Sequence, residues 1–379
     1  MTSGSATPSL AIFLGGMEGS PVEEWMRGVL EAAALDTAEV ALASGAFARV
    51  VLAADRAPGL AVPDGLEVRI DGVGTSGSAF RFGPAFVALA EELPPAGVAY
   101  IGAGSGPLLR PADFEALVLA MADGVCVTNN RFSSDLFALT DPQSVALLDP
   151  VAEKDNAIPR RLRDEHGIEV VELPRTLATQ FNLDTPSDAL ALALSGRAGP
   201  RLTAALADAP AVERMQRAAR PFVDRTAEVL VAGRVSSRTW QYLETETACR
   251  IRLLSEERGM QSAGTDVAGT ARSILGQLIL EAGPVRTFGV LLPELCDAAF
   301  IDLRPALVQL GIRASRADRF AADLRRPEEI EDPALRAIVE AVQVSPVPVV
   351  LGGHSLVGGS LELLNQWAWD EHDAATAGG

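Results

Sequence analysis

The feature of this sequence that most constrains its fold is an alternation of short apolar runs with longer amphipathic segments through residues 10–195. Several runs end in glycine or an acidic residue, and several amphipathic segments carry proline in their first turn, as helices do. This pattern predicts a mostly parallel, doubly wound sheet that helices cover on both faces. The expected strands are Leu10–Leu14, Arg49–Ala54, Leu66–Ile70, Val98–Ile101, Gly124–Thr128, Leu136–Leu139, Ile168–Leu173 and Thr179–Leu183.

Glycine clusters follow three of these strands, at residues 15–16, 72–77 and 102–106. Ligands of parallel sheets bind beyond the carboxyl ends of the strands, so these clusters are expected to face a ligand. The helices expected between the strands begin at Pro21 or cover Pro84–Leu93, Pro111–Ala122, Asn156–His166 and Pro186–Leu194.

The length of 379 residues favours two domains. We expect an α/β domain over residues 1–195, a linker over 196–225 that is rich in Ala, Arg and Pro, and a C-terminal domain over 226–379. The C-terminal domain reads as a mainly helical α/β unit. Its expected strands are Glu228–Ala232 and Arg250–Leu254, and its expected helices are Ser237–Thr247, Val267–Ala282, Val290–Ala298, Arg304–Leu310, Ala317–Leu324 and Pro333–Val342.

The net charge of −18 narrows the range of partners. Nucleic acids and anionic membrane surfaces both require clustered basic residues, so neither is expected to bind this chain. A small phosphorylated ligand remains compatible, because a local site of arginines and helix N-termini is independent of the overall charge. Lys154 is the only lysine, so any mechanism that needs a lysine has one candidate.

The rare residue types indicate a cytoplasmic protein. The three cysteines, Cys126, Cys249 and Cys296, are widely spaced and odd in number, which argues against a disulfide framework. The three histidines match no common zinc-binding spacing. The N-terminus lacks the pattern of a signal peptide, and no apolar run is long enough to span a membrane.

The segment PVVLGGHSLVGGSL, residues 348–361, has the strand, glycine turn and helix of a nucleophile elbow. Its second glycine comes one residue late for G-x-S-x-G, and the 24 residues after Ser355 offer only Asp370 and His372 as triad partners. The hydrolase interpretation is therefore disfavoured. We expect Ser355 to cap the following helix, and the glycine turn remains a plausible anion site.

The segment FNLDTPSD, residues 181–188, places an acidic residue, Asp184, at the end of an expected strand. Thr185 is suited to cap the next helix and Pro186 to open it. A carboxylate in this position is well placed to hold a divalent cation over a phosphate. The plain alternative is that Asp184 belongs only to the helix cap.

Residues 9–195 resemble the GT-A-like nucleotidyltransferases, in particular the molybdenum-cofactor and 2-phospho-L-lactate guanylyltransferases. FNLDTPSD is similar to their N-x-D-T-P-x-D-L motif, VAYIGAGSGPLLRPADFEAL (residues 98–117) to their central strand, loop and helix, and DNAIPRRLRDEHGIEVVEL (residues 155–173) to the segment before the motif. The resemblance implies transfer of a nucleoside monophosphate from a nucleoside triphosphate to a phosphorylated or hydroxyl small-molecule acceptor, assisted by Mg²⁺.

Carried onto this sequence, the resemblance assigns catalysis to Asp184 and Arg27 and metal binding to Asp184 and Asp135. It assigns nucleotide binding to Gly15, Gly16, Gly104, Ser105 and Gly106. Two departures stand out. The first loop, GGMEGS, lacks the basic residues of the family, which leaves Arg27 as the nearest cation, and Ser105 occupies the position of the central acidic metal ligand.

Two functional hypotheses remain open at this point. The first is an active, divergent nucleotidyltransferase, and the second is a protein of the same fold that binds a nucleotide or phosphate without transferring it. For residues 226–379 we expect the arginines Arg234, Arg238, Arg250, Arg252 and Arg258 to pair with nearby acids, and Asp302 to pair with Arg304. The alternatives for this half are a phosphate or acceptor pocket near residues 353–359 and a dimerisation module that forms a homodimer.

Overall fold

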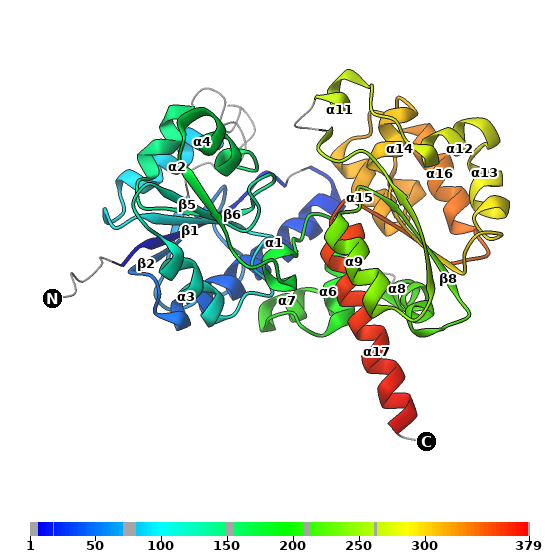
Figure 1. Ribbon diagram of the computed structural model, residues 1–379, viewed down its shortest axis with the longest axis horizontal. Helices are drawn as coiled ribbons and strands as arrows, with labels where there is room; N and C mark the ends of the chain where they lie inside the picture. Colours follow the sequence, from blue (N-terminus) through cyan, green and yellow to red (C-terminus); the bar gives the residue numbers. More distant parts are fainter. Residues whose placement is uncertain are drawn as a thin grey trace. The chain divides into compact units, whose positions relative to one another are not determined.

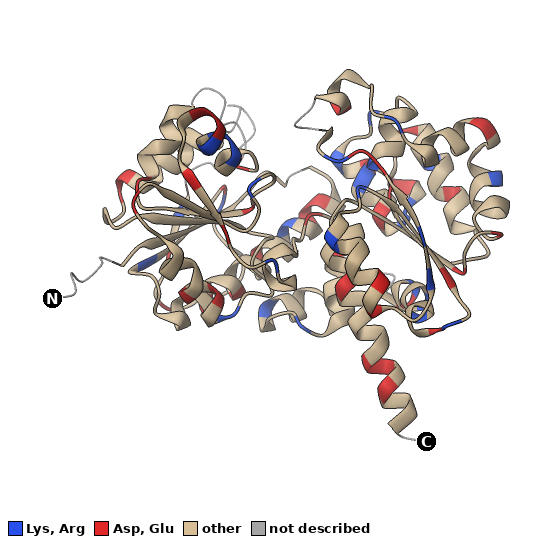
Figure 2. Ribbon diagram, viewed as in Figure 1, with Lys and Arg blue, Asp and Glu red and all other residues tan. Residues whose placement is uncertain are grey.

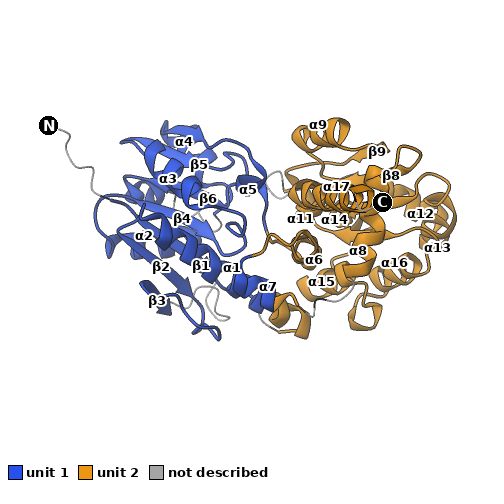
Figure 3. Ribbon diagram, turned by 90° about the horizontal axis from the view of Figure 1, so that it is seen from below, with its two compact units in different colours: residues 1–18, 27–182, 199–204 blue, residues 19–26, 183–198, 205–379 orange. Residues whose placement is uncertain are grey.

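The computed structural model describes residues 7–17, 19–70, 81–148, 155–207, 209, 212–260 and 264–377. The chain divides into two compact units, coloured separately in Figure 3. Unit 1 comprises residues 1–18, 27–182 and 199–204, and unit 2 comprises residues 19–26, 183–198 and 205–379. The predicted glycine cluster at 72–77 and Lys154 lie outside the described residues.

Unit 1 is built on a seven-stranded sheet with the order β3-β2-β1-β4-β6-β5-β7. All neighbouring strands are parallel except β6, which runs antiparallel to β4 and β5. The mostly parallel sheet expected from the alternating pattern is thus present. The strands are β1 (Ser9–Leu14), β2 (Arg49–Ala54), β3 (Leu66–Ile70), β4 (Val98–Gly102), β5 (Val125–Thr128), β6 (Leu136–Leu139) and β7 (Glu169–Glu172).

Helices cover both faces of this sheet (Figure 1). One face packs against α2 (Phe82–Glu91), α4 (Ile158–His166) and the 3₁₀ helix η1 (Pro142–Leu148), around an aromatic cluster that includes Phe86, Tyr100 and Phe137. The other face carries α3 (Pro111–Ala120) and the long helix α1 (Pro21–Ser44), which starts among the residues assigned to unit 2.

The last predicted strand of the N-terminal half, Thr179–Leu183, is wrong. The chain forms the short helix α5 (Leu177–Gln180) and then an irregular segment. The Thr176 side chain accepts a hydrogen bond from Thr179 N at 3.2 Å, so a local helix cap competes with the extended conformation. Phe181 and Leu183 are nevertheless buried, which explains why the segment has the composition of a strand.

Unit 2 contains a second, entirely parallel sheet with the order β11-β10-β8-β9. Its strands are β8 (Glu228–Gly233), β9 (Arg250–Ser255), β10 (Ala298–Asp302) and β11 (Val349–Gly352). Strand β10 was missed by the sequence prediction, which placed a helix over Val290–Ala298. All five residues of β10 are buried, and a short, continuously apolar strand has no alternation that separates it from a buried helix.

The helices of unit 2 pack on this second sheet. Apolar residues of α12, α14, α15 and α16 form one core with β8, β10 and β11. The rings of Phe222 and Phe300 stack with their centroids 5.3 Å apart. Both side chains are buried in the core of unit 2. The helices are α6 (Pro186–Ser195), α8 (Val212–Ala219), α9 (Ser237–Glu246), α11 (Thr265–Ala268), α12 (Ile274–Ala282), α13 (Pro284–Arg286), α14 (Arg304–Gln309), α15 (Arg316–Leu324), α16 (Pro333–Gln343) and α17 (Leu361–Ala377).

The observed division differs from the predicted domain boundaries. Residues 183–195, expected in the first domain, belong to unit 2, and the expected linker contains α7 (Pro200–Ala205) and α8. Met215, Ala218 and Phe222 are buried. This apolar stripe makes the second half of the expected linker part of a hydrophobic core rather than a solvated connection.

Charged residues of both signs are distributed over both units, and the outer part of α17 is acidic (Figure 2). In the described part of the chain, no single helix is long and apolar enough to cross a membrane. The segments Ile274–Ala282 and Pro284–Leu291 meet the length and composition criteria only as a pair bent by 113°. The three cysteines are buried and unpaired.

Candidate functional site

In unit 1 the predicted glycine loops lie where expected, at the carboxyl ends of central strands. Gly15 and Gly16 directly follow β1, and Gly104, Ser105 and Gly106 follow the neighbouring strand β4. The Ala103 amide donates to the Phe13 carbonyl at 3.0 Å. This bond holds the start of the second loop against the end of β1.

Arg27, to which the resemblance assigns catalysis, lies buried in a network of ion pairs. Its side chain is 1% exposed and lies between two carboxylates, with Nη2 2.9 Å from Asp55 Oδ1 and Nη1 3.0 Å from Glu31 Oε2. Asp55 also accepts from Gly16 N at 3.1 Å, and Glu31 accepts from the amides of residues 59 and 60. Arg27 therefore ties α1 to the ends of β1 and β2, and it is too buried to clamp a phosphate.

Ser105 links the loop after β4 to the acidic-motif segment. Its Oγ donates to Asn182 Oδ1 at 3.1 Å, and only 7% of the residue is exposed. Asn182 is the asparagine of FNLDTPSD, 77 positions away in the sequence. Two of the three segments on which the family resemblance rests therefore meet at this edge of the sheet.

Gly106 has a packing role. A Cβ at this position would lie 2.4 Å from Thr37 Cγ2 of helix α1, closer than two carbon atoms can approach. Asp135 lies at the start of β6 beside the end of β4, where its carbonyl accepts from Gly102 N at 3.0 Å. Its carboxylate accepts from Asn156 Nδ2 at 3.0 Å.

The two residues predicted to bind Mg²⁺, Asp135 and Asp184, do not lie in one unit. Within either unit, the described residues include no group of three or more His, Cys, Asp or Glu side chains placed to share an ion. Asp135 and Asp184 belong to different units, and the central position is the hydroxyl of Ser105. At a nucleotide, Mg²⁺ is usually held by one or two carboxylates together with substrate phosphates and waters, and Asp135 and Asp184 are the carboxylates predicted for this role.

In unit 2 the predicted residue Asp184 meets the glycine-rich turn that follows β11. Ser355 Oγ donates to Asp184 Oδ2 at 2.6 Å, and His354 Nδ1 lies 3.5 Å from the same oxygen. The His354 side chain is 52% exposed. The pKa of His354 is lowered, because partial desolvation of the ring and repulsion from Arg234 and Arg258 outweigh attraction to Asp184 and Asp302.

This geometry corrects the interpretation of Ser355 as a helix cap. The Ser355 hydroxyl makes no capping hydrogen bond, and its backbone is already helical at φ −65° and ψ −33°. The geometry also gives no support to a nucleophilic serine. In a triad the serine hydroxyl donates to the histidine, whereas here the serine donates to the carboxylate and the histidine lies beside that carboxylate.

Asp188, in the first turn of α6, is the most strongly perturbed acid of the motif segment. It is fully buried, and its carboxylate accepts from Thr185 N and Oγ1, both at 2.9 Å, and from Ser360 Oγ at 2.7 Å. Burial, with repulsion from Asp184, raises its pKa to about 8 against these hydrogen bonds. Asp188 joins the motif segment to the end of the glycine-rich turn.

Sequence reasoning missed the arrangement at the carboxyl ends of β8 and β10. Arg234 directly follows β8, and its Nε and Nη2 reach Asp302 Oδ2 and Oδ1 at 2.6 and 3.2 Å. Burial raises the pKa of Asp302, but attraction to Arg234 and Arg304 outweighs it, and the pKa lies below its ordinary value. The expected Asp302–Arg304 pairing is replaced by an ion pair between Arg304 Nη2 and Asp323 Oδ2 at 2.9 Å. The available signal was a charged residue at the end of each strand, directly after β8 and as the last residue of β10.

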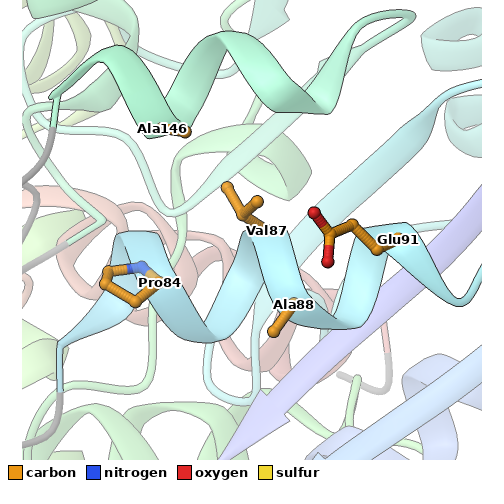
Figure 4. A pocket seen from close by; sticks show the side chains of 5 residues that line it. All are labelled: Pro84, Val87, Ala88, Glu91 and Ala146. Carbon is orange, nitrogen blue, oxygen red and sulfur yellow. The ribbon is translucent and has the colours of Figure 1, made fainter.

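A hollow of about 280 Å³ lies elsewhere in unit 1 (Figure 4). It is lined by side chains of α2 and by Ala146 of η1. None of the predicted site residues contributes to it, so it is not the candidate site.

No protein-family model and no curated protein matches this chain. Among solved structures, the chain is similar to a nucleotidyl transferase from Methanothermobacter thermautotroptrophicus. The two share 14% sequence identity with a TM-score of 0.36, over 49% of this chain and 95% of the other.

Proposed function

We propose that this chain is a nucleotidyltransferase-like protein that binds a nucleoside triphosphate, or a similar phosphorylated small molecule, at the carboxyl edge of the seven-stranded sheet. The observation that supports this most is the hydrogen bond from Ser105 to Asn182, which joins the loop after β4 to the motif segment. The Gly15–Gly16 loop borders the same edge of the sheet.

Binding without transfer is the form of this proposal that the geometry favours. Metal-assisted transfer needs a cation that neutralises the phosphates, and the residues that would hold it do not gather within either unit. Arg27, the basic residue nearest the first loop in sequence, is committed to Asp55 and Glu31. Transfer to an acceptor remains the second candidate, and the same experiment tests it.

The test is calorimetric titration of the full chain with ATP, GTP, CTP and UTP, with and without Mg²⁺. We expect at least one nucleotide to bind, with weaker binding by the Ser105→Ala variant because the loop loses its link to Asn182. Ser44→Ala provides a control, since Ser44 bonds only within the end of α1.

Absence of binding to any nucleotide would overturn the proposal. Pyrophosphate release, followed by mass spectrometry with phosphorylated and hydroxyl acceptors, separates the two candidates. Its absence alongside nucleotide binding supports the non-catalytic form, and its presence establishes transfer.

A further inference from the structure

The four-stranded sheet of unit 2 has a topological switch point between β8 and β10. The chain proceeds from β8 through α9 to β9 on one side, and from β10 through α14–α16 to β11 on the other. Open parallel sheets bind ligands beyond the carboxyl ends of the strands at such a point. In this unit, three adjacent strands carry polar side chains at that edge.

Arg234 lies at the switch point next to a backbone conformation that requires glycine at position 233. The preceding residue, Gly233, has φ +133°, and a Cβ there would lie 2.3 Å from Asp302 Cβ. Because Gly233 lies so close to Asp302, both carboxylate oxygens of this fully buried residue accept hydrogen bonds from the Arg234 guanidinium. A guanidinium has five N–H donors, and the ion pair with Asp302 uses two of them. Since 22% of the Arg234 side chain is exposed, a ligand can accept hydrogen bonds from the others.

Two buried atoms of the Arg304–Asp323 ion pair also lack hydrogen-bond partners among the described residues. Among the residues that the structure describes, neither Arg304 Nη1 nor Asp323 Oδ1 makes a hydrogen bond, although both atoms are shielded from solvent. Buried polar groups of this kind are normally satisfied by protein, water or a ligand. Asp323 is fully buried and lies in the same charge cluster, as its electrostatic interaction with Asp302 indicates.

Several arginines belong to this charge cluster. Arg234, Arg304 and Arg319 act on its carboxylates, and Arg234 and Arg258 act on His354. Asp184, Asp302 and Asp323 belong to the same cluster, and Asp318 acts on Arg319. In a protein whose net charge is −18, arginines gathered at a ligand-facing edge are the side chains that a small anionic ligand would contact.

We propose that the carboxyl edge of β8, β10 and β11 is a second ligand site, which takes the anionic group of a small metabolite, a phosphate or a carboxylate, between Arg234 and His354. Asp302 is a positioning residue that fixes the guanidinium. Asp184 holds the turn that carries His354 through its bond to Ser355. This site is separate from the nucleotide site proposed for unit 1.

The test uses imidazole NMR signals of the full chain, which has only three histidines, His166, His354 and His372. The His354→Ala variant assigns the His354 signal. Sulfate, inorganic phosphate and succinate are titrated separately, with sodium chloride at matched ionic strength as the reference. We expect at least one of the three anions to shift the His354 signal saturably, while His166 and His372 follow the chloride reference.

The Arg234→Gln variant is expected to weaken this binding at least tenfold. The control is Arg250→Gln, since Arg250 pairs with Glu228 at the amino end of β9, the opposite end of the same sheet. Ser105→Ala must leave the response unchanged, which separates this site from the nucleotide site. A response to succinate alone identifies a carboxylate ligand, and a response to phosphate or sulfate identifies a phosphate-type ligand.

A His354 signal that responds to none of the three anions beyond the chloride reference would overturn the proposal. An equal response in wild type and in a folded Arg234→Gln variant would do the same. If Arg234→Gln fails to fold, calorimetric titration of the anions into His354→Ala decides the matter. His354 is half exposed, so this variant should fold, and unchanged affinity in it would contradict the proposed site.

Discussion

Ser355 and Asp184, 171 positions apart in the sequence, are joined by a hydrogen bond of 2.6 Å from Oγ to Oδ2. Each residue belongs to a segment with a recognisable motif, one similar to a hydrolase elbow and the other to the end of a nucleotidyltransferase domain. The bond gives each of them a partner that neither motif implies. It makes Ser355 a support for the turn after β11 rather than a nucleophile.

The Ser355→Ala variant tests this role. Loss of a hydrogen bond to a carboxylate that is 32% exposed should lower the free energy of unfolding by about 1 kcal/mol. Chemical denaturation measures this change. The wild-type protein should also remain unlabelled by fluorophosphonate probes, and covalent modification at Ser355 would contradict the supporting role.

Replacement of Arg27 by Met should destabilise the protein strongly. The substitution leaves the carboxylates of Asp55 and Glu31 without their buried cation, and removal of one partner from a buried ion pair costs about 3–5 kcal/mol. Urea denaturation measures the loss. The control, Arg49→Met, removes a pair whose arginine is 33% exposed and should cost less than about 1 kcal/mol.

Gly233 should tolerate no side chain. Gly233→Ala brings a Cβ against Asp302 and also imposes a positive φ on alanine, so it should unfold more readily than wild type by several kcal/mol, about 1–3 from each effect. Gly311→Ala is the matched control, since Gly311 has φ +69° with nothing within 4 Å of the added Cβ. Equal melting temperatures for the two variants would show that the contact with Asp302 is unimportant.

The buried acid Asp188 predicts a distinctive pH dependence. Its pKa is about 8 in the folded protein and 3.8 in the reference state, so folding favours the protonated form. The stability that this group contributes is fully present below pH 3.8 and falls as the pH rises towards 8.

Asp188→Asn imitates the protonated acid and removes this dependence. The unfolding free energy of the variant minus that of wild type should rise between pH 4 and pH 8, by up to about 1.4 kcal/mol per pH unit. Denaturation at a series of pH values measures the difference. A constant difference would mean that Asp188 is ionised throughout the range.

The local patterns of the sequence predicted most of the fold correctly. The strands from β1 to β9 were identified, because alternating buried strands and proline-opened helices leave a regular trace in the sequence. Two short segments are exceptions with different causes. At Thr179–Leu183 a helix cap formed by Thr176 replaces the expected strand, whereas the mostly apolar β10 fits both helix and strand, and packing decides between them.

Local sequence patterns also indicated where the candidate site residues lie, since Gly15, Gly104, Asp184 and Arg234 are each near the end of a strand or just before a helix. Which partners these residues contact depends on the folded arrangement of the strands. In the folded protein Arg27 is buried between Asp55 and Glu31, Ser355 donates a hydrogen bond to Asp184, and Arg234 forms an ion pair with Asp302. Partners separated by tens to hundreds of residues leave no periodic signal in one sequence, because their contact depends on strand order rather than on local propensity.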